Sequence, residues 1–308
     1  MRFNKLDLNL LVALDALLTE RSVSRAADKL FLSQSAMSNA LGRLRDHFDD
    51  PLLVQMGRKM TLTPRAEVLI DPVRDILVRI EATVSTKPDF DAVTSDREFS
   101  LLVSDYTITV LMPHLIELIS QEAPNVRLRF VAQLTQPERM LERGTADFLV
   151  IPKGFCSHAH PLEVLYDETF VCVVWEHGKF GKRISKEEYL EAQHVEVEIP
   201  GPNASTFDHW FLEKYGVVRK AATSTFSFAS VPRLVVGTNR IATIHARLAR
   251  QFSDSLPIRI MELPVEMPAM QQCAQWHTHH SSDPGIRWLR GMLYRAVAKM
   301  EEQVGTPH

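Results

Sequence analysis

The stretch SQSAMSNALGRLRDHF, from Ser33 to Phe48, decides the fold of the N-terminal part of the chain. Ser33 is a good helix N-cap, because its hydroxyl can accept a hydrogen bond from a backbone N–H of the first turn. Apolar side chains then recur at spacings of four, three and four, so they share one face that has to be buried. These side chains are Met37, Leu41, Leu44 and Phe48. The stretch therefore predicts an amphipathic helix.

The other faces of this helix carry short polar and cationic side chains. Side chains of these types hydrogen-bond to base edges and phosphates in protein–DNA complexes. An ordinary solvated helix is the alternative, but such a helix would carry more Glu and Lys. We predict DNA contacts from Ser33, Gln34, Ser35, Ser38, Asn39, Arg43 and Arg45.

The segments around this helix favour a winged helix-turn-helix. A leucine-rich stripe over residues 6–20 and a short segment over residues 23–30 predict two preceding helices. A tight link to the Ser33 helix then makes a helix-turn-helix. Residues 52–63 predict a hairpin with Arg58 at its tip, where the cation would reach a phosphate or the minor groove. A plain solvated hairpin is the alternative.

A long helix is predicted after the hairpin. Thr63 can cap it, and Pro64 suits its first position. Arg65, at its start, is a further predicted phosphate contact. Apolar side chains at a/d-like spacings favour pairing with a second chain, although packing against the helix's own domain is the alternative. This stripe consists of Leu69, Val73, Ile76, Ile80 and Val84.

Composition describes a soluble globular protein. The 308 residues are 45% apolar and 24% charged, and no apolar run approaches the roughly 20 residues of a membrane span. The three scattered cysteines, without CxxC spacing, are typical of buried thiols in a reducing cytoplasm. The net charge is −3, but residues 1–65 hold ten Lys/Arg against seven Asp/Glu, so a basic head precedes an acidic body.

Residues 98–308 alternate strand and helix patterns after a polar hinge. Strands are predicted over residues 98–104, 126–131, 146–151, 169–175, 240–244 and 270–276, with helical patterns between most of them. The alternation predicts an α/β fold with parallel pairing. A closing helix is predicted from Asp283 to Glu302.

Motifs along nearly the whole chain resemble the LysR-type transcriptional regulators. In residues 1–85 these are DLNLLVALDALL, SVSRAADKLFLSQSAMSNALGRLRDHFDDPLLV and LTPRAE. DFDAVTSDREFSLLVSDY, RGTADFLV, DETFVCV, IATIHARLA and SSDPGIRWLR resemble the branch that contains the nodulation regulator NodD and the salicylate-responsive NahR. In the family, Pro often follows the Gln of the recognition helix, whereas this chain has Ser35.

This resemblance implies a division of the chain and a set of partners. A winged helix-turn-helix (1–64), a linker and dimerisation helix (65–86) and a hinge (87–97) would precede an effector-binding domain (98–308). That domain would resemble periplasmic binding proteins, with subdomain I at 98–164 and 270–308 and subdomain II at 165–269. The implied partners are operator DNA, a small aromatic effector such as a flavonoid or hydroxylated aromatic acid, RNA polymerase, and further copies in a homodimer or homotetramer.

Ligands of open α/β sheets bind where strands end and the topology switches. Aromatic walls with a few hydroxyls there would suit a flat phenolic ligand, although these aromatic residues could equally be core. Thr169 stands where NahR-like sequences carry His, which favours a neutral polyphenol. The predicted effector contacts are Ser104, Asp105, Tyr106, Thr107, Pro152, Thr169, Ser205, Phe207, Phe226, Phe228 and Trp276.

Motifs of catalysis are missing from the sequence. It contains no GxSxG, P-loop or GxGxxG motif. The histidines near residues 158–160 and 277–280 lack a companion ligand at zinc spacing, so neither metal nor cofactor is predicted. A ligand-responsive activator of transcription is the leading hypothesis. An α/β enzyme with a regulatory DNA-binding domain and a purely architectural DNA binder are the alternatives.

Overall fold

A computed structural model describes residues 2–3, 6–57, 59–85, 89–133, 136–199 and 206–304 of the chain. Internal contacts divide the chain into two compact units, Met1–Thr86 and Lys87–His308, which are described separately. Two predicted site residues, Arg58 and Ser205, lie outside the described residues. Within those residues, no helix combines the length and the apolar character needed to cross a membrane.

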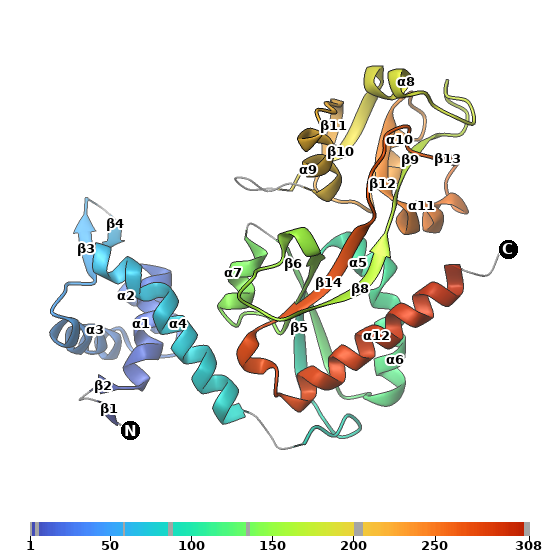
Figure 1. The fold of residues 1–308 in the computed structure, drawn as a ribbon. Coiled ribbons are helices and arrows are strands. Elements are labelled where there is room, and N and C mark those ends of the chain that lie inside the picture. The colour runs from blue at the N-terminus through green and yellow to red at the C-terminus, as the bar shows by residue number, and fades with distance from the viewer. Residues whose placement is uncertain are drawn as a thin grey trace. The chain divides into compact units, whose positions relative to one another are not determined.

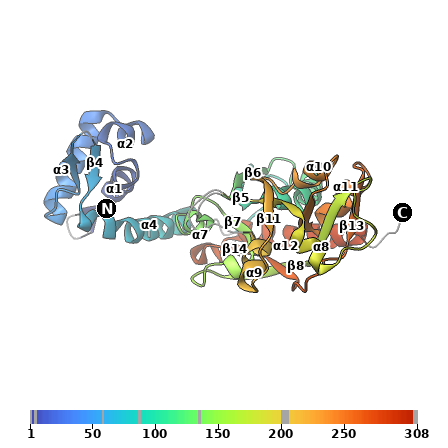
Figure 2. The same cartoon turned by 90° about the horizontal axis from the view of Figure 1, so that it is seen from above.

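The N-terminal unit is a winged helix-turn-helix, with three helices gathered beside a hairpin and followed by a long helix (Figures 1 and 2). Side-chain oxygens of Ser22, Ser33 and Thr63 accept backbone hydrogen bonds at the starts of α2, α3 and α4, which confirms the predicted caps Ser33 and Thr63. The elements are β1 (Arg2–Phe3), β2 (Leu6–Asp7), α1 (Asn9–Glu20), α2 (Val23–Lys29), α3 (Gln34–Phe48), β3 (Leu53–Met56), β4 (Lys59–Leu62) and α4 (Pro64–Ser85).

Helix α4 packs onto the core of its own unit. Ala66 and Val73 join the buried cluster built by α1, α2 and α3, and Val73 is only 3% exposed. The assignment of Val73 to a dimer stripe is therefore wrong, because its side chain is already covered within the unit. Ile76 and Val84, which belong to the same predicted stripe, remain 42% and 81% exposed.

The first sheet of the C-terminal unit has the order β6-β5-β7-β14-β8. β5 is parallel to β6 and β7, whereas β14 is antiparallel to β7 and β8. Alternate residues of β5 and β7 point to two different clusters, one packed by α5, α6 and α12 and the other by α7. The elements are β5 (Glu98–Val103), α5 (Asp105–Val110), α6 (Met112–Glu122), β6 (Arg127–Ala132), α7 (Pro137–Glu142), β7 (Phe148–Pro152), η1 (Lys153–Phe155), β8 (Leu162–Glu168), β14 (Met270–Trp276), η2 (Thr278–His280) and α12 (Pro284–Val304).

The second sheet has the order β11-β10-β12-β9-β13 and is also mixed. β10 is parallel to β11 and β12, and β9 is antiparallel to β12 and β13. The clusters on its two faces include α8 on one side and α10 and α11 on the other. The elements are β9 (Phe170–Trp175), α8 (Lys186–Glu191), β10 (Gln193–Val197), α9 (Phe207–Lys214), β11 (Lys220–Thr225), α10 (Val231–Val235), β12 (Ile241–His245), α11 (Ala246–Ser253) and β13 (Ile258–Met261).

The chain crosses between the two sheets at two neighbouring strands. β8 belongs to the first sheet up to Glu168, and β9 begins the second sheet at Phe170. The return passage ends at Met270, where β14 pairs with Glu168 of β8. The architecture confirms the predicted α/β domain of two subdomains, but its pairing is mixed rather than parallel throughout.

The burial of Val73 generates a prediction about stability. Val73→Ala should destabilise the N-terminal unit by about 1.5–3 kcal/mol, because it removes buried methyl groups. Val84→Ala, on the exposed part of the same helix, should change stability by less than about 0.5 kcal/mol. Every Trp and Tyr of the chain lies beyond residue 86, so fluorescence does not report on this unit. Hydrogen-exchange mass spectrometry of α1 peptides is the measurement, and equal protection in both variants would contradict the packing.

Candidate DNA-binding and effector-binding sites

The polar face of α3 is exposed, while its apolar face is buried. Met37, Leu41 and Leu44 are covered by the core of the unit. Ser33 caps the helix by accepting from the backbone N–H of Ala36 at 3.1 Å, and its hydroxyl lies 3.0 Å from that of Ser35. The four predicted base-reading residues, Gln34, Ser35, Ser38 and Asn39, are all exposed. This geometry presents one polar helix face of the size that a major groove admits.

The predicted phosphate-binding arginines differ in what they contact. Arg45 donates from Nε to the carbonyl oxygen of Pro51 (2.8 Å) and from a guanidinium nitrogen to that of Leu53 (3.0 Å). Its guanidinium thus holds the start of the hairpin against α3, a role that the sequence interpretation as a phosphate contact missed. Arg43 is half exposed and lies 3.8 Å from an Asp7 carboxylate oxygen, and Arg65 is exposed.

In the C-terminal unit, Asp105 joins the two subdomains. It stands in the first turn of α5, directly after the cap Ser104. Its carboxylate accepts hydrogen bonds from the Ser227 hydroxyl at 2.7 Å and from the Ala229 backbone N–H at 3.0 Å. Ser227 and Ala229 belong to the segment between β11 and α10 of the other subdomain. These hydrogen bonds hold the two subdomains together at this edge.

A buried polar cluster continues behind Asp105. The Tyr106 hydroxyl donates to the Glu168 carboxylate, and the Tyr106 ring stacks on His245 with centroids 3.8 Å apart. Burial, and after it the charges nearby, raises the pKa of Tyr106 well above its usual value. Burial also lowers the pKa of His245, which keeps its ring neutral at pH 7. A guanidinium nitrogen of Arg247 lies 3.4 Å from a carboxylate oxygen of Glu168, so the positive charge of Arg247 balances the negative charge of Glu168.

Aromatic rings line the space around His245. Phe170 and Phe228 lie with their ring centroids 4.9 and 5.1 Å from that of His245. Phe207 stacks on Phe170 at 5.8 Å with an interplanar angle of 10°. The structure thus brings the predicted residues Tyr106, Phe207 and Phe228 together around a histidine that the sequence interpretation did not single out.

Three side chains of this cluster, those of Gln272, His245 and Arg247, each carry a buried polar atom without a hydrogen-bond partner among the described residues. Gln272 donates to the Thr107 hydroxyl at 3.3 Å, and both side chains are fully buried. The Oε1 atom of Gln272 and the Nδ1 atom of His245 are buried and have no hydrogen-bond partner among the residues that the structure describes. An unpaired buried polar atom costs about 1–3 kcal/mol, so these two atoms are candidates for contacts to a ligand.

Other predicted effector contacts lie elsewhere. Trp276 pairs with Phe148 at the end of β14 opposite Gln272, and its indole N–H donates to the Ser281 hydroxyl at 3.1 Å. It is a core residue of the first subdomain, so its assignment to the cleft is wrong. Phe226 is 81% exposed. Thr169 is exposed at the crossing, and Pro152 is partly buried at the end of β7.

Residues that the sequence interpretation missed lie in motifs that it quoted for other reasons. Glu168 is part of DETFVCV, and His245 and Arg247 are part of IATIHARLA. Two sequence signals were available for these residues. One was an acidic residue just before a hydrophobic strand, and the other was a histidine at the end of a strand. Gln272, in a polar pair within a buried strand, was a third.

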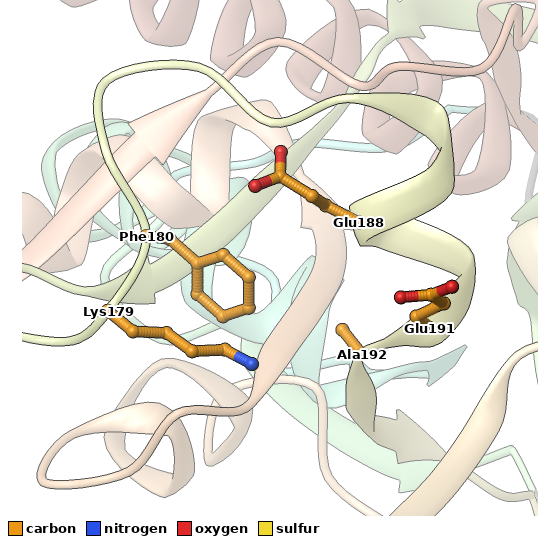
Figure 3. Close-up of a pocket in the computed structure, with 5 residues that line it drawn as sticks. All are labelled: Lys179, Phe180, Glu188, Glu191 and Ala192. Atoms are coloured by element: carbon orange, nitrogen blue, oxygen red, sulfur yellow. The ribbon is translucent and has the colours of Figure 1, made fainter.

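A histidine pair and a surface pocket lie outside the aromatic cluster. The His160 and His277 rings lie 4.5 Å apart, but the described residues contain no group of three or more metal-ligating side chains placed to hold a metal. A pocket of about 240 Å³ lies in the second subdomain between the loop at Phe180 and α8 (Figure 3). Lys179, Glu188 and Glu191 around it are solvent-facing charges, and it lies apart from the aromatic cluster.

Comparison with known families accounts for both units. Residues 8–67 match the bacterial regulatory helix-turn-helix protein model of the lysR family, and residues 94–298 match the LysR substrate binding domain. The chain belongs to the LysR family. It is therefore a DNA-binding transcriptional regulator with a domain that responds to a small ligand.

Individual relatives match this LysR regulator over almost its full length. It is 38% identical to Nodulation protein D of Bradyrhizobium sp. (strain ANU 289), with 100% of this chain and 91% of the relative covered. It is 40% identical to Nodulation protein D 2 of Bradyrhizobium diazoefficiens, with 97% and 91% covered. The crystal structure of the probable transcriptional regulator PA0477 from Pseudomonas aeruginosa is similar at a TM-score of 0.64 and 29% identity, with 94% and 97% covered.

The different contacts of the arginines generate a second prediction. Arg65→Ala should reduce the slope of log K against log salt for operator binding by about 0.9, because one phosphate contact is lost. Arg45→Ala should lower operator affinity without changing that slope, because it loosens the hairpin instead. Fluorescence anisotropy with labelled operator DNA between low and moderate salt measures both. An unchanged slope in Arg65→Ala together with a reduced slope in Arg45→Ala would reverse these roles.

Proposed function

We propose that the effector of this regulator is a flat, hydroxylated and neutral aromatic compound of the flavonoid type, bound between the two subdomains, and that it activates transcription. One observation carries the proposal. Gln272 Oε1 and His245 Nδ1 are buried polar atoms without hydrogen-bond partners among the described residues, and the rings of Phe170 and Phe228 flank His245, with Phe207 stacked on Phe170. Phenolic hydroxyls could donate to these atoms, while the rings would stack on the aromatic plane of the ligand.

The charges nearby favour a neutral ligand over an aromatic acid. Arg247 is the cation of this cluster, and Glu168 already matches its charge at 3.4 Å. The carboxylate of Asp105 would repel an acid from the same edge. A hydroxylated aromatic acid, which the resemblance to NahR also implies, is the second candidate, and its carboxylate would have to compete with Glu168 for Arg247.

The switch would act through the relative angle of the subdomains. A ligand shifts such an equilibrium only if it binds one arrangement better than the other. Asp105 holds Ser227 and Ala229 across the interface, so an effector that enters between α5 and the second subdomain changes the balance of these contacts. We propose that this change reaches the DNA-binding units and then RNA polymerase.

We propose that two chains pair through α4 into a homodimer. Two homodimers then form a homotetramer on two operator half-sites, in the cytoplasm where the operator lies. The exposed side chains of Ile76 and Val84, with the partly buried Ile80 between them, support the dimer. Membership of a regulator family supports a role without catalysis over the alternative of an α/β enzyme with a regulatory DNA-binding domain.

The effector proposal predicts a selective effect of one aromatic ring. Phe228→Leu, which keeps apolar volume but removes the ring, should weaken flavonoid binding by about tenfold and leave operator affinity unchanged. Tyr215→Leu is the matched control, because its ring is 64% exposed outside this cluster. Isothermal titration calorimetry with a panel of flavonoids and hydroxybenzoates measures the affinities. Full flavonoid affinity in Phe228→Leu would place the ligand elsewhere.

The dimer proposal predicts dissociation by charge on the exposed stripe. Ile76→Glu combined with Ile80→Glu should yield smaller species in sedimentation velocity, because two like charges would face each other in every dimer. Asp71→Lys changes charge on the opposite side of α4 and should leave the assembly intact. Unchanged sedimentation of the double variant would show that α4 does not pair two chains.

A further inference from the structure

Two of the three cysteines lie side by side in the first subdomain. Cys273 is a fully buried residue of β14, and Cys156 is a partly buried residue directly after η1. The segment from Lys153 to Ser157 turns back over β14. Contacts at both of its ends fix this course and hold the two cysteines opposite each other.

Those contacts are hydrogen bonds to two glutamines that flank Cys273. Lys153 donates from Nζ to Gln271 Oε1 at 3.0 Å. At the other end, the Ser157 N–H donates to Gln275 Oε1 at 3.0 Å, and Gln275 Nε2 donates back to the Ser157 carbonyl at 2.7 Å. Residues 153 and 157 are thereby tied to residues 271 and 275, which places Cys156 beside Cys273.

The electrostatics of the pair favour a thiolate. The neighbouring Cys156 side chain lowers the pKa of the Cys273 thiol, and the Lys153 ammonium acts in the same direction. The neighbouring Cys273 sulfur and burial raise the pKa of the Cys156 thiol. The pair therefore favours a thiolate on Cys273 with a protonated Cys156 beside it.

We propose that Cys156 and Cys273 form a reversible dithiol–disulfide pair that reacts with hydroperoxides. Nothing in this proposal depends on the identity of the aromatic effector. The third cysteine provides the contrast: Cys172 is buried in β9, and burial alone raises the pKa of its thiol, so it stays inert.

The reaction balances with hydrogen peroxide as the oxidant. The Cys273 thiolate takes up the proton of Cys156, the partly exposed sulfur, as that sulfur becomes the nucleophile. This sulfur attacks one peroxide oxygen, the O–O bond breaks, and the departing hydroxide takes up a proton to become water. The Cys273 sulfur then attacks the Cys156 sulfenic acid, forms the S–S bond and releases a second water. Two thiols are oxidised and one peroxide is reduced.

The position of the pair connects it to the subdomain interface. Phe155 precedes Cys156 and lies against Trp210 of α9 in the other subdomain, with ring centroids 6.4 Å apart. A disulfide would fix the segment that carries Phe155 to β14. The oxidation state of the pair would then influence how the two subdomains meet.

The test uses the reduced full-length protein treated with hydrogen peroxide. After quenching, the protein is denatured, its free thiols are labelled with a maleimide, and intact mass and peptide maps are recorded. The expected product has lost two hydrogens, carries label on Cys172 only, and yields one cross-linked peptide containing Cys156 and Cys273. Dithiothreitol should restore three labelled thiols. Because wild type carries this readout, a variant that fails to fold does not weaken the test.

Matched variants separate the pair from its surroundings. Cys172→Ser should keep the cross-link, whereas Cys156→Ser and Cys273→Ser should each abolish it. Lys153→Gln should slow disulfide formation by about three- to tenfold at neutral pH, since a nearby cation typically shifts a thiol pKa by about half a unit to one unit. Three labelled thiols after treatment, a cross-link that includes Cys172, or a disulfide between chains would overturn the proposal.

Discussion

The chain passes between the two sheets of the C-terminal unit twice, and both passages meet at one place. β8 leads to β9 through the single residue Thr169, and the return strand β14 starts beside β8, with Met270 paired to Glu168. Two adjacent crossings make a hinge, because they permit a change of angle while limiting translation. The residues on either side of Thr169, Glu168 and Phe170, are consequently fixed at the base of the subdomain interface.

Buried polar groups concentrate at this hinge. Glu168 is 1% exposed and is stabilised there by Tyr106 and Arg247, while Gln272 and His245 each keep one buried atom without a hydrogen-bond partner in the part of the chain that the structure describes. Buried polar atoms without a hydrogen-bond partner are rare in protein interiors, because each one lowers the stability of the fold by about as much as a hydrogen bond contributes. A ligand that satisfies them would gain more affinity than it could at a solvated surface. In the proposed binding mode, the polar cluster would determine both which ligand is bound and how its binding affects the angle between the subdomains.

The arginines of the N-terminal unit differ in role, because one stabilises the fold and others are predicted to contact DNA. Arg45 contacts the carbonyl groups of Pro51 and Leu53 and so determines where the hairpin begins relative to α3. Arg65 and the polar residues of α3 remain exposed. A guanidinium that donates to backbone carbonyls within the unit is not available to a phosphate. It instead positions the helix and the hairpin that carry the predicted DNA contacts.

Local signals in the sequence determined the helices and the hairpin of the N-terminal unit, although Leu6–Asp7, predicted as the start of the first helix, forms β2, and α1 begins at Asn9. Caps at Ser22, Ser33 and Thr63, and the spacing of Met37, Leu41 and Leu44, act within one or two helical turns, so they can be read without tertiary information. The alternation of strands and helices likewise determined an α/β domain. β8, β10, β11 and β13 were not predicted, because short strands at mixed positions carry a weak pattern. The family motifs indicated a transcriptional regulator of the LysR type, because they extend along nearly the whole chain.

Tertiary structure decided which residues share a site. Trp276 and Gln272 lie on one strand, β14. Only its antiparallel pairing with β7 shows that Trp276 lies beside the first residue of β7 and Gln272 beside the last. Val73 has the spacing of a dimer stripe, but the packing of α4 covers it within its own unit. His245, Glu168 and Tyr106 are far apart in sequence and meet because the chain crosses twice between its sheets. Cys156 and Cys273 meet for a related reason, since β14 returns to the first sheet. Such contacts depend on the pairing of distant strands, which no local pattern of residues encodes.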